Sequence, residues 1–169
     1  MASARAIVFW LLAAITVVAA VTASLASPLL AWRQPVYIIA GFAGVLAMVF
    51  LVVQPLVVAG FMPGVPRAIG RYAHRWTGLS LVFCIVVHVV GLWITSPPDV
   101  IDALLFASPT PFSAWGVVAM WAAFAAAAVA VARGRMNLPL RSWRRLHTFL
   151  AAVVVIGSVV HALLIDGTM

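Results

Sequence analysis

Four histidines are the residues of this chain whose type and spacing best suit metal chemistry. They form two pairs, His74 with His88 and His147 with His161, and in each pair the separation is 14 positions (88 − 74 = 161 − 147 = 14). In an α-helix 14 residues turn through about 1400°, which is about 40° short of four full turns, so both members of a pair would face the same way. The rise between them is about 21 Å, which fits inside a hydrocarbon core of about 30 Å. The spacing therefore predicts two helices that each present two ligands at different depths.

The composition indicates that these helices lie in a membrane. Of the 169 residues, 66% are hydrophobic and only 8% are charged. A soluble domain of this length could not bury so much apolar surface. The net charge of +7 comes from ten arginines against three aspartates. Because these arginines lie in short loops between apolar runs, they favour a role in membrane topology over nucleic-acid binding.

Five apolar runs are long enough to cross a bilayer. They cover residues 6–30, 36–60, 72–95, 114–132 and 144–165. The second run contains a polar, kink-prone point at Gln54 and Pro55. The connections are a proline- and arginine-bearing loop at 62–71, a longer segment at 96–112 with a short interfacial helix at 99–106, and a basic loop at 133–145. The sequence thus predicts an all-α integral membrane bundle of five transmembrane helices, organised as one domain over residues 1–169.

The arginines also predict the orientation, because cytoplasmic loops carry the excess of cations. A cytoplasmic N-terminus places nine of the ten arginines inside: Arg5, Arg67, Arg71, Arg75, Arg133, Arg135, Arg141, Arg144 and Arg145. Arg33 and all three acids, Asp99, Asp102 and Asp166, then fall outside. Tryptophans mark both interfaces, Trp76 and Trp143 inside and Trp32, Trp93 and Trp115 outside. We expect a multi-pass protein of the inner (plasma) membrane.

The first run has a competing interpretation as a secretory signal. Arg5, the apolar stretch and the small residues at 23–26 resemble a signal peptide with its cleavage site. The run is longer than a usual signal core, so we favour an uncleaved anchor. Cleavage would leave four spans with the same orientation.

Topology assigns a depth to each histidine. The third and fifth runs both lead from inside to outside, so His74 and His147 (the inner histidines) lie near the cytoplasmic ends. His88 and His161 (the outer histidines) lie towards the other face. A single intramembrane histidine is explained by a hydrogen bond to a neighbouring helix, but four of matched spacing and depth favour function.

Two histidines at each level suit haem iron better than zinc. Zinc needs three or four converging ligands, and neither level offers a carboxylate or thiolate beside its two imidazoles. The lone Cys84 is best interpreted as a small buried hydrophobe. Small residues lie on the histidine faces, where they could flank a macrocycle or simply pack helices: Thr77, Gly78, Gly91, Ala151, Gly157 and Ser158.

Haem propionates need cationic partners. At the inner level the candidates are Arg71, Arg75, Arg144 and Arg145, which could equally mark only the cytoplasmic side. Arg33 is the corresponding candidate outside, with a plain loop residue as the alternative. Trp76 and Phe149 could pack on an inner porphyrin or belong to the interface.

Two stretches carry a resemblance to a known family. Residues 71–78 (RYAHRWTG) leading to His88, and 144–148 (RRLHT) leading to His161, resemble the ferric reductase-like transmembrane domain. That family includes ferric reductases, NADPH oxidases and the haem subunit of periplasmic methionine-sulfoxide reductases. The resemblance implies that His74 and His147 ligate an inner haem b, and His88 and His161 an outer one.

The sequence departs from the family in two respects. Many members have a sixth span, and here the sequence ends just after the fifth, through truncation or because it is naturally shorter. Larger members carry a flavin and nicotinamide domain, whereas no glycine-rich dinucleotide turn occurs here. Electrons would then come from a cytoplasmic flavin reductase or a quinol, with any flavin belonging to that partner.

The leading hypothesis is therefore an oxidoreductase component that transfers electrons through two haems to a periplasmic protein or a ferric chelate. No catalytic acid, base or nucleophile is expected. A first alternative is the haem subunit of a methionine-sulfoxide reductase system. A second, from another class, is a histidine-dependent membrane transporter or anchor subunit without haem, although no acidic residue lies within the spans to complete a proton relay.

Overall fold

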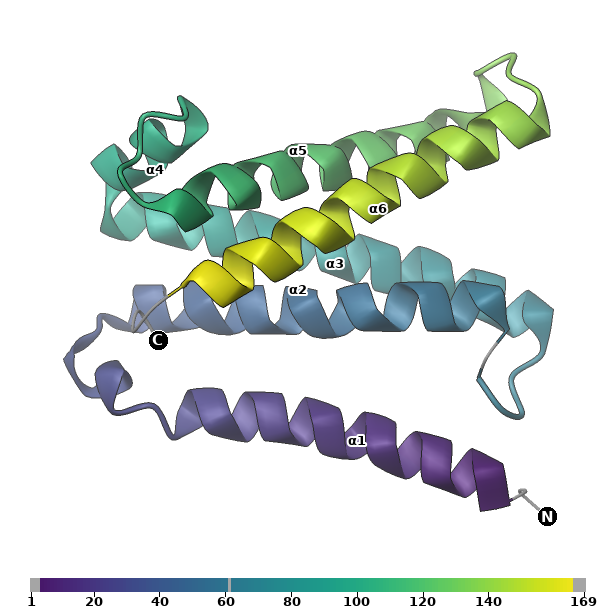
Figure 1. The fold of residues 1–169 in the computed structure, drawn as a ribbon, viewed down its shortest axis with the longest axis horizontal. Coiled ribbons are helices and arrows are strands. Elements are labelled where there is room, and N and C mark those ends of the chain that lie inside the picture. Colours follow the sequence, from purple (N-terminus) through teal and green to yellow (C-terminus); the bar gives the residue numbers. More distant parts are fainter. Residues whose placement is uncertain (1–3, 61, 166–169) are drawn as a thin grey trace. The chain divides into compact units, whose positions relative to one another are not determined.

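The computed structural model describes residues 4–60 and 62–165 (Figure 1). Asp166, which we expect at the outer face, lies outside the described residues. The helical elements in chain order are α1 (Ala4–Leu25), η1 (Pro28–Trp32), α2 (Pro35–Ala59), α3 (Arg67–Thr95), α4 (Pro97–Leu104), α5 (Pro111–Val131), η2 (Ala132–Gly134) and α6 (Leu140–Leu164). No strand occurs in the described ranges.

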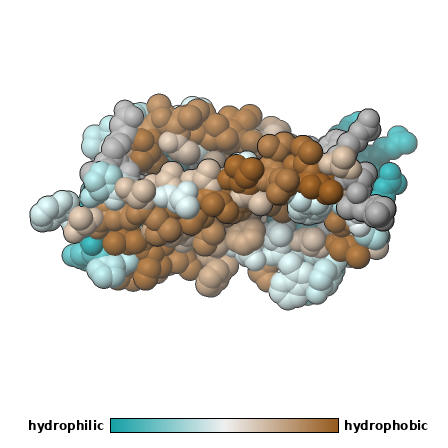
Figure 2. Space-filling view, turned by 90° about the horizontal axis from the view of Figure 1, so that it is seen from below, coloured by the Kyte–Doolittle hydropathy of each residue, from teal (hydrophilic) through white to brown (hydrophobic). Residues whose placement is uncertain are grey.

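Five of these helices, α1, α2, α3, α5 and α6, are long and apolar enough to cross a membrane. This confirms the predicted all-α fold and the predicted number of spans. Many large apolar side chains point outwards along them: Leu12 is 60% exposed, Phe83 66% and Ile156 58%. Figure 2 shows apolar residues along most of the visible surface and hydrophilic residues towards its ends. Such a surface suits lipid as the surrounding solvent.

Polar side chains within α1 find partners in their own helix. The hydroxyls of Thr16, Thr22 and Ser24 each donate to the carbonyl four residues earlier, at 2.7–2.9 Å. In hydrocarbon every polar group must be satisfied internally, and this local bond meets that need.

The chain divides into two compact units, with the boundary in the sequence directly after Gly91. In the first unit α2 and α3 form an antiparallel hairpin, joined by the turn that follows Gly60, the left-handed C-cap of α2 (φ 73°). In the second unit α5 and α6 form the corresponding hairpin and pack along each other (Figure 1). The two hairpins carry all four histidines.

The two histidine-bearing helices begin earlier than the sequence predicts. Helix α3 starts at Arg67 rather than residue 72, because the carbonyl of Pro66 accepts a bond from Gly70 N at 2.9 Å and opens the first turn. Helix α6 starts at Leu140 rather than 144, where the carbonyl of Pro139 accepts from Trp143 N at 3.0 Å. Proline fixes a φ that suits entry into a helix. The predicted loops 62–71 and 133–145 are correspondingly shorter.

Two other boundaries also differ from the prediction. Helix α1 ends at Leu25, and the predicted run to residue 30 instead continues as the 3-10 turn η1. The predicted interfacial helix at 99–106 exists, but it begins two residues earlier with Pro97 in its first turn. It ends before Phe106, whose φ of 56° is left-handed.

Candidate functional site

The structure places each histidine pair on one helix. His74 and His88 lie on α3, and His147 and His161 lie on α6. Both inner histidines come seven residues after the first residue of their helix (74 − 67 = 147 − 140 = 7). All four side chains are half-buried.

The outer histidines are held by a backbone carbonyl of the preceding helix in their hairpin. In the first unit His88 Nδ1 lies 2.8 Å from the carbonyl oxygen of Ala40 on α2. In the second unit His161 Nδ1 lies 2.8 Å from the carbonyl oxygen of Phe112 on α5. The Phe112 ring also meets the His161 ring edge-to-face, with centroids 5.6 Å apart.

These contacts define which ring nitrogen carries the proton. A carbonyl oxygen can only accept, so Nδ1 of His88 and of His161 must be the N–H donor. In a neutral imidazole Nε2 then holds the lone pair. A backbone carbonyl on Nδ1–H is the usual arrangement behind a histidine that binds a metal through Nε2. The donor set therefore fits axial ligation of a haem iron.

His74 is bracketed by one residue of α2. The carbonyl of Gln54 lies 3.3 Å from His74 Nδ1, and the Gln54 side-chain amide donates to the carbonyl of His74 at 3.2 Å. The same amide donates to Thr77 Oγ1 at 3.0 Å, and the Thr77 hydroxyl donates to the carbonyl of Ala73 at 2.8 Å. Gln54 is thus a site residue that sequence reasoning identified only as a polar point beside a proline.

His147 is held differently, by an aromatic neighbour on its own helix. Its ring stacks on Trp143 with centroids 5.4 Å apart and planes 7° apart. Trp143 is fixed in turn by an indole N–H bond to the carbonyl of Val129 on α5 at 3.0 Å, and Arg133 lies over its ring at 5.4 Å. The sequence marked Trp143 only as an interface residue, although its place four residues before His147 puts both on one face.

The other two aromatics that the sequence indicated make no ring contact with a histidine among the residues that the structure describes. Trp76 is 54% exposed and meets Tyr72 edge-to-face at 6.1 Å. Phe149 is 65% exposed. Their position suits the interfacial alternative.

The three glycines on the histidine faces, which could flank a macrocycle or pack helices, each lie against the neighbouring helix of their own hairpin. A Cβ on Gly78 would lie 3.1 Å from the Gln54 amide nitrogen, and one on Gly91 would lie 2.7 Å from the Cβ of Ala40. A Cβ on Gly157 would lie 3.0 Å from the Cβ of Ala119. In each case the space that the glycine leaves is already filled by the neighbouring helix of the same hairpin, so the packing alternative holds.

The candidate propionate partners lie near the starts of the two histidine helices. Arg71 and Arg75 follow Arg67 at four-residue intervals along α3, and all three are exposed. Arg144 and Arg145 are exposed in the first turns of α6. Arg33 stands apart from them in sequence, with its guanidinium over the ring of Tyr37 at 4.6 Å.

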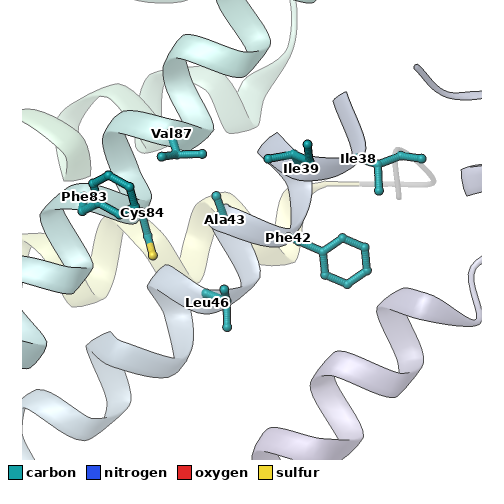
Figure 3. A pocket seen from close by; sticks show the side chains of 8 residues that line it. All are labelled: Ile38, Ile39, Phe42, Ala43, Leu46, Phe83, Cys84 and Val87. Atoms are coloured by element: carbon teal, nitrogen blue, oxygen red, sulfur yellow. The ribbon is translucent and has the colours of Figure 1, made fainter. Parts of the chain in front are cut away.

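An apolar pocket of about 280 Å³ lies between α2 and α3 (Figure 3). Figure 3 shows Ala43 of α2 and Cys84 of α3 pointing towards each other's helix. The lining residues are Ile38, Ile39, Phe42, Ala43, Leu46, Phe83, Cys84 and Val87. No histidine or arginine is among them, so this pocket is separate from the candidate ligands.

Comparison with known families identifies a match over the middle of the chain. The family model described as "Ferric reductase like transmembrane component" matches residues 60–158. The matched segment is 99 residues long (158 − 60 + 1), more than half of the 169, and contains His74, His88 and His147 but ends before His161. No curated protein and no solved structure gives a significant match to the chain.

Proposed function

Because the chain belongs to the ferric reductase-like transmembrane family, we propose that it transfers electrons across the membrane through two b-type haems. The family membership suggests transmembrane electron transfer in general. The number of haems, their ligands, the donor and the acceptor are our proposal, with residues 1–169 acting as one haem-binding domain.

The observation that carries the proposal is the shared orientation of the outer histidines. His88 and His161 each donate through Nδ1 to a carbonyl at 2.8 Å. This supports the proposal because Nε2 would then be the nitrogen that binds iron. The inner histidines His74 and His147 occupy matching positions seven residues into their helices. We assign His74 and His147 to an inner haem and His88 and His161 to an outer one.

The bound haems would supply one-electron chemistry, since their iron alternates between ferrous and ferric states. The chain would fix the imidazoles, surround them with apolar side chains and exclude water. Arg71, Arg75, Arg144 and Arg145 would neutralise the propionates of the inner haem, and Arg33 those of the outer haem. Because the chain would offer two imidazoles to each iron, it would leave no coordination position for a substrate, and the terminal acceptor would be reduced without binding to iron.

The orientation follows from the arginine distribution. We propose a cytoplasmic N-terminus in the inner (plasma) membrane, with electrons moving from a cytoplasmic flavin reductase or a quinol towards an extracytoplasmic acceptor. Reporter fusions after residues 64 and 137 should be cytoplasmic, and a fusion after residue 108 should be extracytoplasmic. The opposite pattern would reverse the direction of transfer.

The decisive test is a reduced-minus-oxidised visible spectrum of the full chain produced with ample haem. We expect b-type bands and two haems per chain. His88→Leu and His161→Leu should each lose the outer haem and keep the inner one. His74→Leu and His147→Leu should each lose the inner haem and keep the outer one, so the variants at one site are the controls for those at the other. Absence of haem bands would refute electron transfer by haem and leave a transporter or anchor, and loss of different haems from His88→Leu and His161→Leu would refute the pairing.

A further inference from the structure

Each outer histidine lies against a glycine of the neighbouring helix. An ideal Cβ on Gly44 would lie 3.0 Å from His88 Nδ1 and 3.2 Å from its Cε1. An ideal Cβ on Gly116 would lie 2.8 Å from His161 Nδ1 and 2.9 Å from its Cε1. In both hairpins the Nδ1 edge of the ring therefore occupies the space that any side chain at the glycine would take.

The two arrangements occupy equivalent positions in the two hairpins. The accepting carbonyls belong to Ala40 and Phe112, 72 residues apart, and the glycines, Gly44 and Gly116, are also 72 apart (112 − 40 = 116 − 44 = 72). The outer histidines are 73 apart (161 − 88), as are the inner ones (147 − 74). The offset is constant within each pair of equivalent helices, 72 residues from α2 to α5 and 73 from α3 to α6, so the hairpins repeat one geometry.

A further contact follows the same offset. The carbonyl of Val57 on α2 faces Gly70 of α3, and the carbonyl of Val129 on α5 accepts the indole bond from Trp143 of α6. These positions are again 72 and 73 residues apart (129 − 57 = 72; 143 − 70 = 73). The repeat therefore extends from the outer histidines to the other end of each hairpin, which the sequence indicated only through the histidine spacing.

Helix geometry explains why the fourth residue after the carbonyl must be glycine. Every Cα–Cβ bond in an α-helix tilts towards the N-terminus, so the side chain at i+4 covers the carbonyl of residue i. Gly44 is four residues after Ala40, and Gly116 is four residues after Phe112. Without a Cβ at these positions, a donor from the facing helix can reach a carbonyl that already accepts its own helical bond.

We infer that Gly44 and Gly116 are positioning residues for the outer haem ligands: each exposes a carbonyl that orients an imidazole through Nδ1 and directs Nε2 towards iron. The inference rests on the proposed function for its ligand, whereas the orientation of the rings stands on the contacts alone. Gly157 offers the contrast within α6. The three atoms nearest to a Cβ there belong to Ala119 and Trp115, whereas at Gly44 and Gly116 all three belong to a histidine.

The test compares Gly116→Ala and Gly44→Ala with the control Gly157→Ala in the full chain. An added Cβ at Gly116 would force the imidazole to move, because the ring is a side chain and the facing backbone is fixed. We expect the outer haem to bind about 10–100-fold more weakly in both variants, as for other groups that orient a metal ligand. The effect should be larger for Gly116→Ala, where the approach is closer, and Gly157→Ala should retain both haems. Wild-type haem binding in Gly116→Ala, or equal loss in Gly157→Ala, would overturn the inference.

A second measurement separates this inference from the proposed function. NMR of labelled histidine nitrogens in the haem-free full chain should show protonated Nδ1 for His161, assigned with His161→Leu. The signal should shift in Gly116→Ala and stay unchanged in Gly157→Ala. An unchanged signal in Gly116→Ala would refute the positioning role. If the wild-type chain took up no haem but the signal still shifted, the proposed function would fail and the positioning of the ring would stand.

Discussion

Gln54→Leu should weaken the inner site by a predictable amount. The substitution keeps the approximate size of the side chain and removes two hydrogen bonds, to Thr77 Oγ1 at 3.0 Å and to the carbonyl of His74 at 3.2 Å. Neither partner loses all its hydrogen bonds, because the Thr77 hydroxyl still lies 2.8 Å from the carbonyl of Ala73 and 3.3 Å from that of His74. Side-chain hydrogen bonds inside membrane proteins contribute about 0.6 kcal/mol each on average. The expected loss is therefore about 1 kcal/mol, or roughly a fivefold weaker inner haem.

A double-mutant cycle isolates the contact. Gln54→Leu, Thr77→Val and the double variant are compared by haem titration and by reversible unfolding in mixed micelles. We expect a coupling energy of about 0.5–1 kcal/mol between Gln54 and Thr77, with the outer haem unaffected. A coupling below about 0.3 kcal/mol, the scatter of independent sites, would refute the proposal that Gln54 braces the segment around His74.

Three further changes test other contacts. Trp143→Leu removes the stacking on His147 and the bond to the carbonyl of Val129. Haem titration should show inner haem binding weaker by about 1–2 kcal/mol, and unchanged binding would refute a supporting role for the stack. Gly91→Ala places a Cβ 2.7 Å from the Cβ of Ala40 and should lower the free energy of unfolding by about 1–3 kcal/mol, whereas Gly134→Ala meets nothing within 4 Å and should not. Arg33→Gln removes a positive charge and should lower the outer haem midpoint in a redox titration; an unchanged midpoint would limit Arg33 to its contact with Tyr37.

The helices were predictable because membrane spans have a strong and local signal. A run of apolar residues of sufficient length must be helical in hydrocarbon, since only a helix satisfies its own backbone there. The sequence predicted α3 and α6 to begin four or five residues too far along the chain. Arg67 and Arg71 had been assigned to a proline- and arginine-bearing loop, and Arg141 to a basic loop. Arginine is a good helix former, and its long side chain extends to the interface from a helix that begins at the membrane surface.

The histidines were identifiable from type and spacing, but the groups that orient them were not. A backbone carbonyl, such as that of Ala40 or Phe112, has no signature in the sequence, and a glycine in an apolar helix has many possible reasons. Gly78, Gly91 and Gly157 lie on the histidine faces and yet serve helix packing. Gly44 and Gly116 were not singled out, because they lie on α2 and α5, far in sequence from the rings that they touch.

Each hairpin prepares its outer ligand from within. His88 is oriented by Ala40 and Gly44 of the first unit, and His161 by Phe112 and Gly116 of the second, so each ring has its carbonyl and its glycine within its own hairpin. Each hairpin carries one inner and one outer histidine, however, and a haem iron held by two imidazoles, as proposed, would need one from each hairpin. Under the proposed function, each haem would therefore join two preorganised halves, and its binding free energy would add to the stability of the whole chain by mass action. Because the imidazoles of His88 and His161 are already oriented before haem binds, less binding free energy would be spent on ordering them, and haem would bind more strongly.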